Sequence, residues 1–268
     1  MQQKNIMPES SYSAHGRKDS VTNTVTVALL VSLVCSVLVS TTAVVLKPKH
    51  LENRLFYGGY RNILELVETI QQGTDVENML RQMDVRLADL ATGEYVENMD
   101  ASQFDQHEAA KDPNLGVPVP EELDIANIGR RARYTTVYLV KENSRIKHII
   151  LPVHGAGMWS TLYGYIALEA DGNTIAGLKF HEHGETPGLG AKIDDPAWLS
   201  QWRGKGVYEN GVPVIKVARG KAPPGSRHEV DGLSGATLTG QGVTNLIQYW
   251  LGEHGFRPYL ERFHNRRE

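Results

Sequence analysis

The residues best suited to chemistry lie between Asp231 and Gly240, where the chain reads Asp-Gly-Leu-Ser-Gly-Ala-Thr-Leu-Thr-Gly. Gly232 and Gly235 lack side chains and would let the backbone come close to a ligand. Hydroxyl side chains follow at Ser234, Thr237 and Thr239. A helix is expected to begin here, and the free N–H groups and dipole of a helix N-terminus suit a phosphate. An ordinary Ser/Thr cap after a glycine turn fits the same residues, so this pattern leaves both interpretations open.

Two further stretches have unusual spacing. Glu185-Thr-Pro-Gly-Leu-Gly190 contains a Pro-Gly pair, which by itself indicates only a turn. Gly155-Ala-Gly-Met-Trp159 joins a glycine-rich segment to a tryptophan. Met158 and Trp159 fit either a binding surface or the hydrophobic core, and the residues alone do not choose between these.

Together the three stretches resemble the FMN-binding domain family. Ser234-Gly-Ala-Thr237, with Asp231 three residues before the serine, resembles the motif at which a flavin transferase moves FMN from FAD onto the last threonine. The Glu185–Gly190 stretch resembles a second signature of the same domain, and Gly155–Trp159 resembles its glycine-rich segment before a tryptophan. This domain is shared by the C subunit of the sodium-translocating NADH:quinone reductase (NqrC) and the G subunit of the related Rnf complex. The chain's length and its segment at about 75–130 favour the NqrC family.

The resemblance implies one covalent FMN, held by a phosphoester to Thr237, and Thr239 does not match the acceptor position. Thr186 is predicted to hydrogen-bond the flavin ring edge, Leu189 to offer an apolar surface to a ring face, and Trp159 to stack. The full set of predicted cofactor-binding residues is Asp231, Ser234, Gly235, Ala236, Thr237, Leu238, Thr239, Glu185, Thr186, Gly188, Leu189, Gly190 and Trp159.

Other chemistry is weakly supported. His181-Glu-His183 has the spacing of two ligands on one strand face, but no third ligand is evident, so no metal site is predicted. Asp194-Asp195 resembles a loop acid pair, and no catalytic residue is predicted. No Walker motif or GxGxxG fingerprint occurs, so the chain itself is not expected to bind NADH.

Composition excludes several classes of protein. The single cysteine, Cys35, rules out an intrachain disulfide and any cysteine-based zinc or iron–sulfur site built from this chain alone. A net charge of −3 gives no field that would attract nucleic acid.

One segment near the N-terminus is predicted to anchor the chain in a membrane. The stretch from Ser20 to Leu46 carries no charge. As a helix, its apolar part from Val25 to Leu46 would reach roughly 33 Å, enough for a hydrocarbon core of about 30 Å. A cleaved signal peptide is the alternative, but its apolar region would be only about 7–15 residues behind a short basic head. Basic residues lie on both sides, so the positive-inside rule does not set the orientation.

The elements that must position the site follow this anchor. An apolar stripe predicts a helix over about 50–70, and a second helix is expected from Asp75 to about Leu90, with mostly irregular chain over 91–130. Short runs of β-branched, aromatic and aliphatic residues, with hairpin turns and no long helix between them, predict antiparallel strands at 134–140, 146–153, 161–168, 174–180 and 212–217. Pro213 should lie at a strand start or on an edge. A final helix is expected over about 239–251.

The predicted fold class is therefore α+β, with a single transmembrane helix, a helical lead-in and an antiparallel-sheet FMN-binding domain. The expected boundaries are a cytoplasmic tail at 1–19, the transmembrane helix at 20–46, the lead-in at 47–130 and the covalent FMN-binding domain at 131–268.

The resemblance implies an electron-carrying subunit in the bacterial inner membrane, with a periplasmic domain. Electrons would arrive from an iron–sulfur centre in neighbouring subunits and pass to a covalent FMN in the B subunit, while the complex exports sodium. Expected partners are the other subunits of the NADH:quinone reductase complex (A, B, D, E and F), the flavin transferase and membrane lipid, with no nucleic acid. The alternatives are the G subunit of an Rnf-type complex, a membrane-tethered flavin-binding sensor without turnover, and a structural subunit whose Thr237 is unused.

Overall fold

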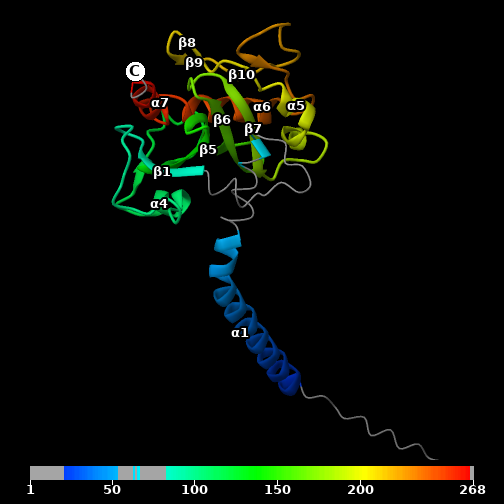
Figure 1. The fold of residues 1–268 in the computed structure, drawn as a ribbon. Coiled ribbons are helices and arrows are strands. Elements are labelled where there is room, and N and C mark those ends of the chain that lie inside the picture. Colours follow the sequence, from blue (N-terminus) through cyan, green and yellow to red (C-terminus); the bar gives the residue numbers. More distant parts are fainter. Residues whose placement is uncertain (1–20, 54–62, 64, 67–82, 266–268) are drawn as a thin grey trace, which may run out of the picture. The chain divides into compact units, whose positions relative to one another are not determined.

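The computed structural model describes residues 21–53, 63, 65–66 and 83–265, and it divides the chain into two compact units at Arg54. The first unit contains helix α1 (Val21–Asn53) (Figure 1). Its segment Val21–Val44, of 24 residues, is long and apolar enough to cross a membrane. Thr26 and Thr42 donate their hydroxyls to the carbonyls of Thr22 and Leu38, one turn back, at 2.8 and 2.7 Å. These two hydroxyls are therefore satisfied within the helix, as a lipid environment favours.

The second unit is built on a five-stranded antiparallel sheet in the order β1-β4-β5-β6-β7. Its strands are β1 (Met83–Asp89), β4 (Tyr134–Glu142), β5 (Arg145–Ala156), β6 (Thr161–Glu169) and β7 (Ile175–Glu182). Asp171 closes the β6–β7 turn by accepting the Asn173 and Thr174 N–H groups at 2.9 and 2.8 Å. The predicted α+β class and the four strands between 134 and 182 are confirmed.

Strand β1 corrects one prediction. The helix expected from Asp75 to about Leu90 is wrong over 83–89, because these residues pair with β4 from Met83↔Val140 to Asp89↔Tyr134. Met83, Val85 and Leu87 alternate with polar residues, which is the spacing of a strand. The sheet thus takes one strand from the predicted lead-in. Residues 75–82, and most of the stripe expected over 50–70, lie outside the described residues.

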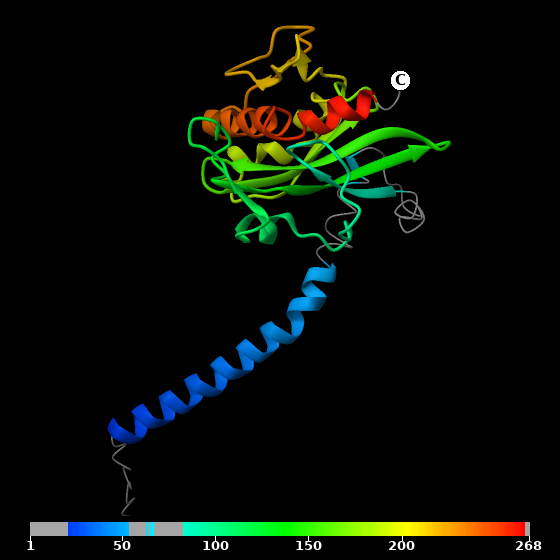
Figure 2. The same ribbon diagram turned by 90° about the vertical axis from the view of Figure 1, so that its left-hand side faces the viewer.

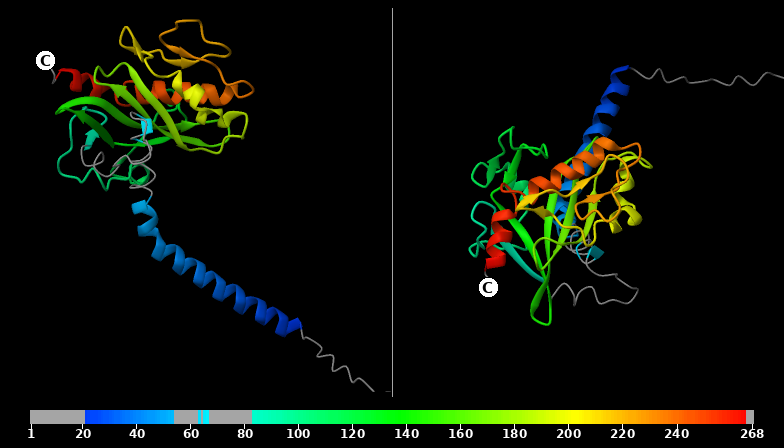
Figure 3. Two further views of the ribbon diagram at one scale, coloured as in Figure 1. Left: turned by 45° about the vertical axis from the view of Figure 1, so that its right-hand side comes forward. Right: turned by 90° about the horizontal axis from the view of Figure 1, so that it is seen from above.

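Helices cover both faces of the sheet. On one face, α6 (Thr237–Trp250) and α7 (Arg257–Asn265) form a layer whose buried side chains join Ile149, Leu151 and Val153 of β5 in one core (Figures 2 and 3). Helix α4 (Gln106–Lys111) lies on the other face (Figure 2). Its His107 ring packs against the rings of His154 and Tyr163. Ile63 and Leu66 are also buried against this second face, beside Ile150 and Ala167.

The remaining elements are short. They are β2 (Gly116–Pro118), β3 (Arg130–Ala132), the 3₁₀ helix η2 (Gly190–Asp194), α5 (Pro196–Ser200), β8 (Tyr208–Glu209), β9 (Val212–Pro213), β10 (Lys216–Val217) and β11 (Glu229–Val230). The strand predicted over 212–217 is two pieces, β9 and β10, in separate two-stranded sheets. Pro213 ends β9 on an edge, as expected of a residue without an N–H. β10 pairs in parallel with β11, which leads directly into Asp231.

Candidate functional site

Helix α6 begins within the Ser234-Gly-Ala-Thr237 motif. Its N-cap residue is Ala236, and no side chain caps it. The interpretation of this stretch as an ordinary Ser/Thr cap is therefore wrong. Gly235 has a φ of +78°, a left-handed conformation that favours glycine and turns the chain into the helix. Thr237 is the first helical residue and is exposed, so its hydroxyl lies beside N–H groups that have no partner within the helix.

The Glu185–Gly190 turn meets this motif. A Cβ on Gly235 would lie 3.0 Å from Cδ2 of Leu189, so the two loops touch. Lys192, in η2, donates to the Ser234 carbonyl at 3.3 Å. Gly188 adopts a φ of +77°, and the Leu189 N–H returns to the Thr186 carbonyl at 3.1 Å, which closes the turn. Two signatures far apart in the sequence thus form one surface.

The Gly155–Trp159 stretch joins them through Glu185. The buried Glu185 carboxylate accepts the Met158 and Trp159 N–H groups on Oε1 at 2.9 and 3.0 Å. Its Oε2 accepts the Thr239 hydroxyl at 2.5 Å. Thr239 is fully buried, whereas Ser234 and Thr237 are exposed. A ligand therefore reaches the hydroxyls at 234 and 237 but not the one at 239.

Each of the three segments that meet at Glu185 presents exposed apolar side chains. We call Met158, Trp159, Leu189 and Leu238 the apolar rim; they are 46%, 67%, 46% and 61% exposed. The core interpretation of Met158 and Trp159 is therefore wrong. Exposed apolar side chains carried by adjoining segments indicate a surface that a ligand or partner covers. The set of predicted cofactor-binding residues includes Trp159 but not Met158, which the structure exposes beside it.

Asp231 lies at the edge of this site and supports a neighbouring loop. Its carboxylate accepts the Ala222 N–H at 2.9 Å and pairs with Lys221 at 3.4 Å. The Ala222 N–H, and then Lys221, hold the pKa of Asp231 below its ordinary value. Its carbonyl accepts the Trp198 indole N–H at 2.7 Å. The side chain of Asp231 thus fastens the 219–222 loop beside the motif.

Lys192 is a second residue that the sequence prediction missed. Its ammonium lies on the motif loop, where it could balance the charge of a phosphate held at the start of α6. A lone lysine in a short 3₁₀ helix carries no sequence signal, and only the meeting of the two loops reveals its position.

The other candidate residues have structural partners. His183 pairs through Nε2 with Asp194 at 2.7 Å, and its Nδ1 accepts the Glu185 N–H at 3.2 Å. Asp195 caps α5 by accepting the Ala197 N–H at 2.8 Å, so the acid pair serves the loop, as predicted. In the part of the chain that the structure describes, no three His, Cys, Asp or Glu side chains are grouped as a metal site would require.

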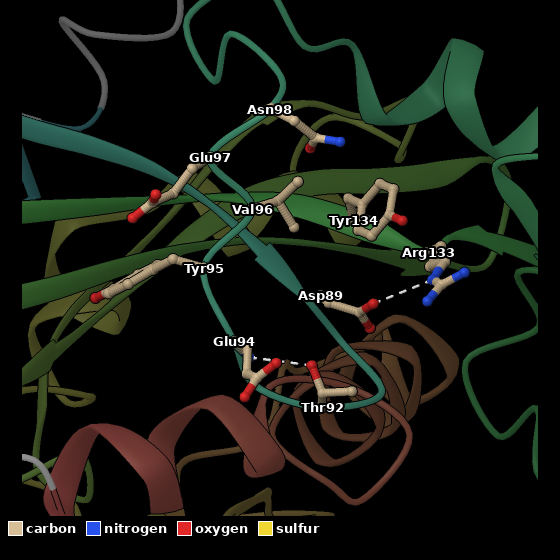
Figure 4. A pocket seen from close by; sticks show the side chains of 9 residues that line it. All are labelled: Asp89, Thr92, Glu94, Tyr95, Val96, Glu97, Asn98, Arg133 and Tyr134. Atoms are coloured by element: carbon tan, nitrogen blue, oxygen red, sulfur yellow. Dashed lines mark hydrogen bonds and ion pairs between the residues drawn. The ribbon is translucent and has the colours of Figure 1, made fainter.

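A separate open hollow of about 490 Å³ lies beside β1 (Figure 4). Its walls are Asp89, Thr92, Glu94, Tyr95, Val96, Glu97, Asn98, Arg133 and Tyr134. The Arg133 guanidinium pairs with Asp89 at 3.0 Å and lies over the Tyr134 ring, so internal contacts engage its charge. None of the predicted cofactor-binding residues lines this hollow.

Known proteins resemble this chain over nearly its whole length. Residues 157–252 match the family model described as FMN-binding domain. The C subunit of the Na(+)-translocating NADH-quinone reductase of Vibrio parahaemolyticus is 44% identical over 250 residues, covering 91% of this chain and 95% of that protein. The protein of the same name from Pseudomonas aeruginosa is 45% identical over 251 residues, covering 91% and 96%.

Solved structures show the same fold. The crystal structure of Shewanella oneidensis NqrC matches with a TM-score of 0.72 at 34% identity, over 76% of this chain and 95% of that one. The crystal structure of the C subunit of Na(+)-translocating NADH-quinone reductase from Parabacteroides distasonis matches with a TM-score of 0.58 at 28% identity, over 74% and 89%.

Proposed function

This chain belongs to the NqrC family, the C subunits of the Na(+)-translocating NADH-quinone reductase, and we propose that it carries electrons through an FMN joined by its phosphate to Thr237. Membership in this family favours NqrC over the G subunit of an Rnf-type complex. The chain contains an FMN-binding domain and is a subunit of an oxidoreductase complex. The proposal adds the covalent link, the residues that hold the cofactor and the route of the electrons.

The observation that carries the proposal is the exposed Thr237 hydroxyl at the uncapped start of α6. The first N–H groups of a helix bind phosphate oxygens, and the helix dipole favours negative charge there. Lys192 supplies a balancing cation on the adjoining loop. The residues present therefore fit the phosphate of FMN.

Formation of the link requires one bond exchange. The Thr237 oxygen would bond to the flavin-side phosphorus of FAD, the P–O bond to AMP would break, and the hydroxyl proton would leave. A flavin transferase would catalyse this step, and an exposed hydroxyl is accessible to such an enzyme. Thr239 is a poor rival because it is fully buried and donates to Glu185.

When bound, the flavin supplies the redox chemistry, and this chain positions it. A group tethered only by its phosphate would swing. In our proposal the apolar rim limits that motion, with Leu189 and Trp159 against the ring faces and Thr186 at the ring edge. Exposures of 46% for Leu189 and 67% for Trp159 leave both side chains available to a ring.

The proposed place in the complex follows the same reasoning. Electrons would reach this flavin from an iron–sulfur centre in neighbouring membrane subunits and continue to the FMN of the B subunit, coupled in the complex to sodium export. Helix α1 would anchor the chain in the inner membrane, with residues 1–19 in the cytoplasm and the flavin domain in the periplasm. The α1 segment at Val21–Val44 contains no charged residue, so an ion path through the chain is not proposed.

The attachment is tested by Thr237→Ala in the full chain, expressed in its native membranes and compared with Ser200→Ala, which removes an exposed hydroxyl outside the motif. The Thr237→Ala change removes one exposed hydroxyl, so the domain should fold while in-gel flavin fluorescence after denaturation disappears. Ser200→Ala should keep the fluorescence. Mass spectrometry of the wild-type peptide containing Thr237 should show the added mass of FMN. Undiminished fluorescence in Thr237→Ala would exclude this residue as the acceptor.

A further inference from the structure

Glu185 has contacts unlike those of a residue that binds a ligand directly. Its carboxylate is buried and accepts three hydrogen bonds, from the Met158 N–H, the Trp159 N–H and the Thr239 hydroxyl. A carboxylate has about four acceptor sites, so most of its capacity is used within the protein. Its main contacts are therefore with the backbone and side chains of the segments that form the site.

Two glycines confirm that the chain is shaped around this carboxylate. A Cβ on Gly157 would lie 2.5 Å from Oε1 of Glu185, and a Cβ on Gly190 would lie 2.4 Å from Oε2. Real side-chain atoms do not approach so closely, so both positions accommodate the carboxylate only because they lack a side chain. One glycine follows β5 and the other begins η2, on either side of Glu185.

Each partner of Glu185 adjoins a side chain of the apolar rim. Met158 and Trp159 bind through their N–H groups while their own side chains are exposed. Thr239 directly follows Thr237 and Leu238, and Gly190 directly follows Leu189. A shift of the carboxylate would therefore move the rim and the proposed attachment point together.

We infer that Glu185 is a positioning residue: its carboxylate locks the 157–159, 185–190 and 237–239 segments into one frame and acts on the flavin through them. The expected effect of Glu185 on a flavin rests on the proposed function. The three-segment frame can also be tested in protein that carries no flavin. Thr239 offers a second way to test the same contact, because its hydroxyl joins the first turn of α6 to the Glu185 carboxylate.

The test compares Glu185→Leu and Thr239→Val with Thr239→Ser, which keeps the hydroxyl, and with Glu209→Leu, at an exposed glutamate on β8. Leucine removes both acceptor oxygens, whereas a glutamine amide could still accept the two N–H groups, and valine removes the hydroxyl. In detergent-solubilised full chain, well below the unfolding midpoint, the covalent flavin's anisotropy decay and visible circular dichroism are recorded. Glu185→Leu and Thr239→Val should at least double the fast-depolarising fraction and reduce the flavin circular dichroism. Thr239→Ser and Glu209→Leu should match wild type.

A second measurement does not depend on flavin. Hydrogen exchange of the peptide containing Met158 and Trp159, in a Thr237→Ala background, should be several-fold faster in Glu185→Leu than in Glu209→Leu. If Glu185→Leu and Thr239→Val match wild type in the flavin measurements, or if Glu185→Leu exchanges no faster than Glu209→Leu, Glu185 is not a positioning residue. If the wild-type chain carries no covalent flavin but the exchange rates respond as expected, the proposed attachment fails while the frame around Glu185 stands.

Discussion

His154 offers a quantitative test of how the sheet and helices pack. It lies on β5 with its ring 4.8 Å from that of Trp250, 5.1 Å from His107 and 5.7 Å from Tyr163. Its Nδ1 is buried and has no hydrogen-bond partner. Burial, and then the neighbouring His107, lower the pKa of His154 from 6.5 to about 3. The folded protein therefore keeps this imidazole neutral at pH values where an unfolded chain protonates it.

The sign of the effect follows directly. Between pH 6.5 and 3 the unfolded state binds a proton at this residue and the folded state does not. The free energy of unfolding therefore falls as the pH falls through this range. Each pH unit below 6.5 costs about 1.4 kcal/mol, so the loss at pH 5 is about 2 kcal/mol.

Replacing His154 by leucine removes this titration. Urea unfolding of the full chain in detergent, repeated between pH 7 and 4.5, measures the slope of stability against pH. In His154→Leu the free energy of unfolding should fall less steeply with falling pH than in wild type, by about 1.4 kcal/mol per pH unit. His254→Gln, at an exposed position, should keep the wild-type slope. His254→Gln controls for the loss of a histidine that is not buried. Equal slopes for His154→Leu and wild type would refute the reasoning.

Three further predictions concern the flavin site and the membrane. Leu189→Ala or Thr186→Ala should keep the covalent link but shift the flavin absorbance and slow NADH:quinone reduction in membranes; wild-type behaviour in both assays would remove this turn from the pocket. Asp231→Ala should lower flavin loading, measured by in-gel fluorescence, without unfolding the domain, and Asp231→Asn should lower it less because its amide oxygen still accepts the Ala222 N–H. A cysteine at the exposed Glu122, after replacement of Cys35, should react with an impermeant probe in intact spheroplasts, and labelling only after lysis would place the domain in the cytoplasm.

The strands that were predicted correctly are those whose pairing strand is close in the sequence. β4 to β7 are joined by short turns and are rich in β-branched and aromatic residues. β1 was mistaken for the end of a helix because its partner, β4, begins 45 residues after β1 ends, at Tyr134 against Asp89. A strand at a sheet edge depends on such a distant partner, which local spacing does not reveal.

The motifs were informative about chemistry because they depend on residue types close together in the chain. Glycines beside hydroxyls at the start of a helix suit a phosphate, and the resemblance to a known motif favoured that interpretation over an ordinary cap. The same patterns could not say which hydroxyl is accessible. Thr239 and Thr237 are two residues apart but differ in accessibility, because the Thr239 hydroxyl is buried against the Glu185 carboxylate whereas Thr237 is exposed to solvent.

Composition and local spacing were thus enough to indicate an apolar anchor, an antiparallel sheet and the helix after the Ser-Gly-Ala-Thr motif, and the resemblance to the FMN-binding domain family singled out Thr237 as the acceptor. These features depend on residues within a few turns of one another. The role of Glu185, the position of Lys192 and the exposure of the apolar rim depend on hydrogen bonds that span 26, 42 and 54 residues. Such contacts form only when the sheet brings its loops to one end, so the tertiary structure alone assigns them.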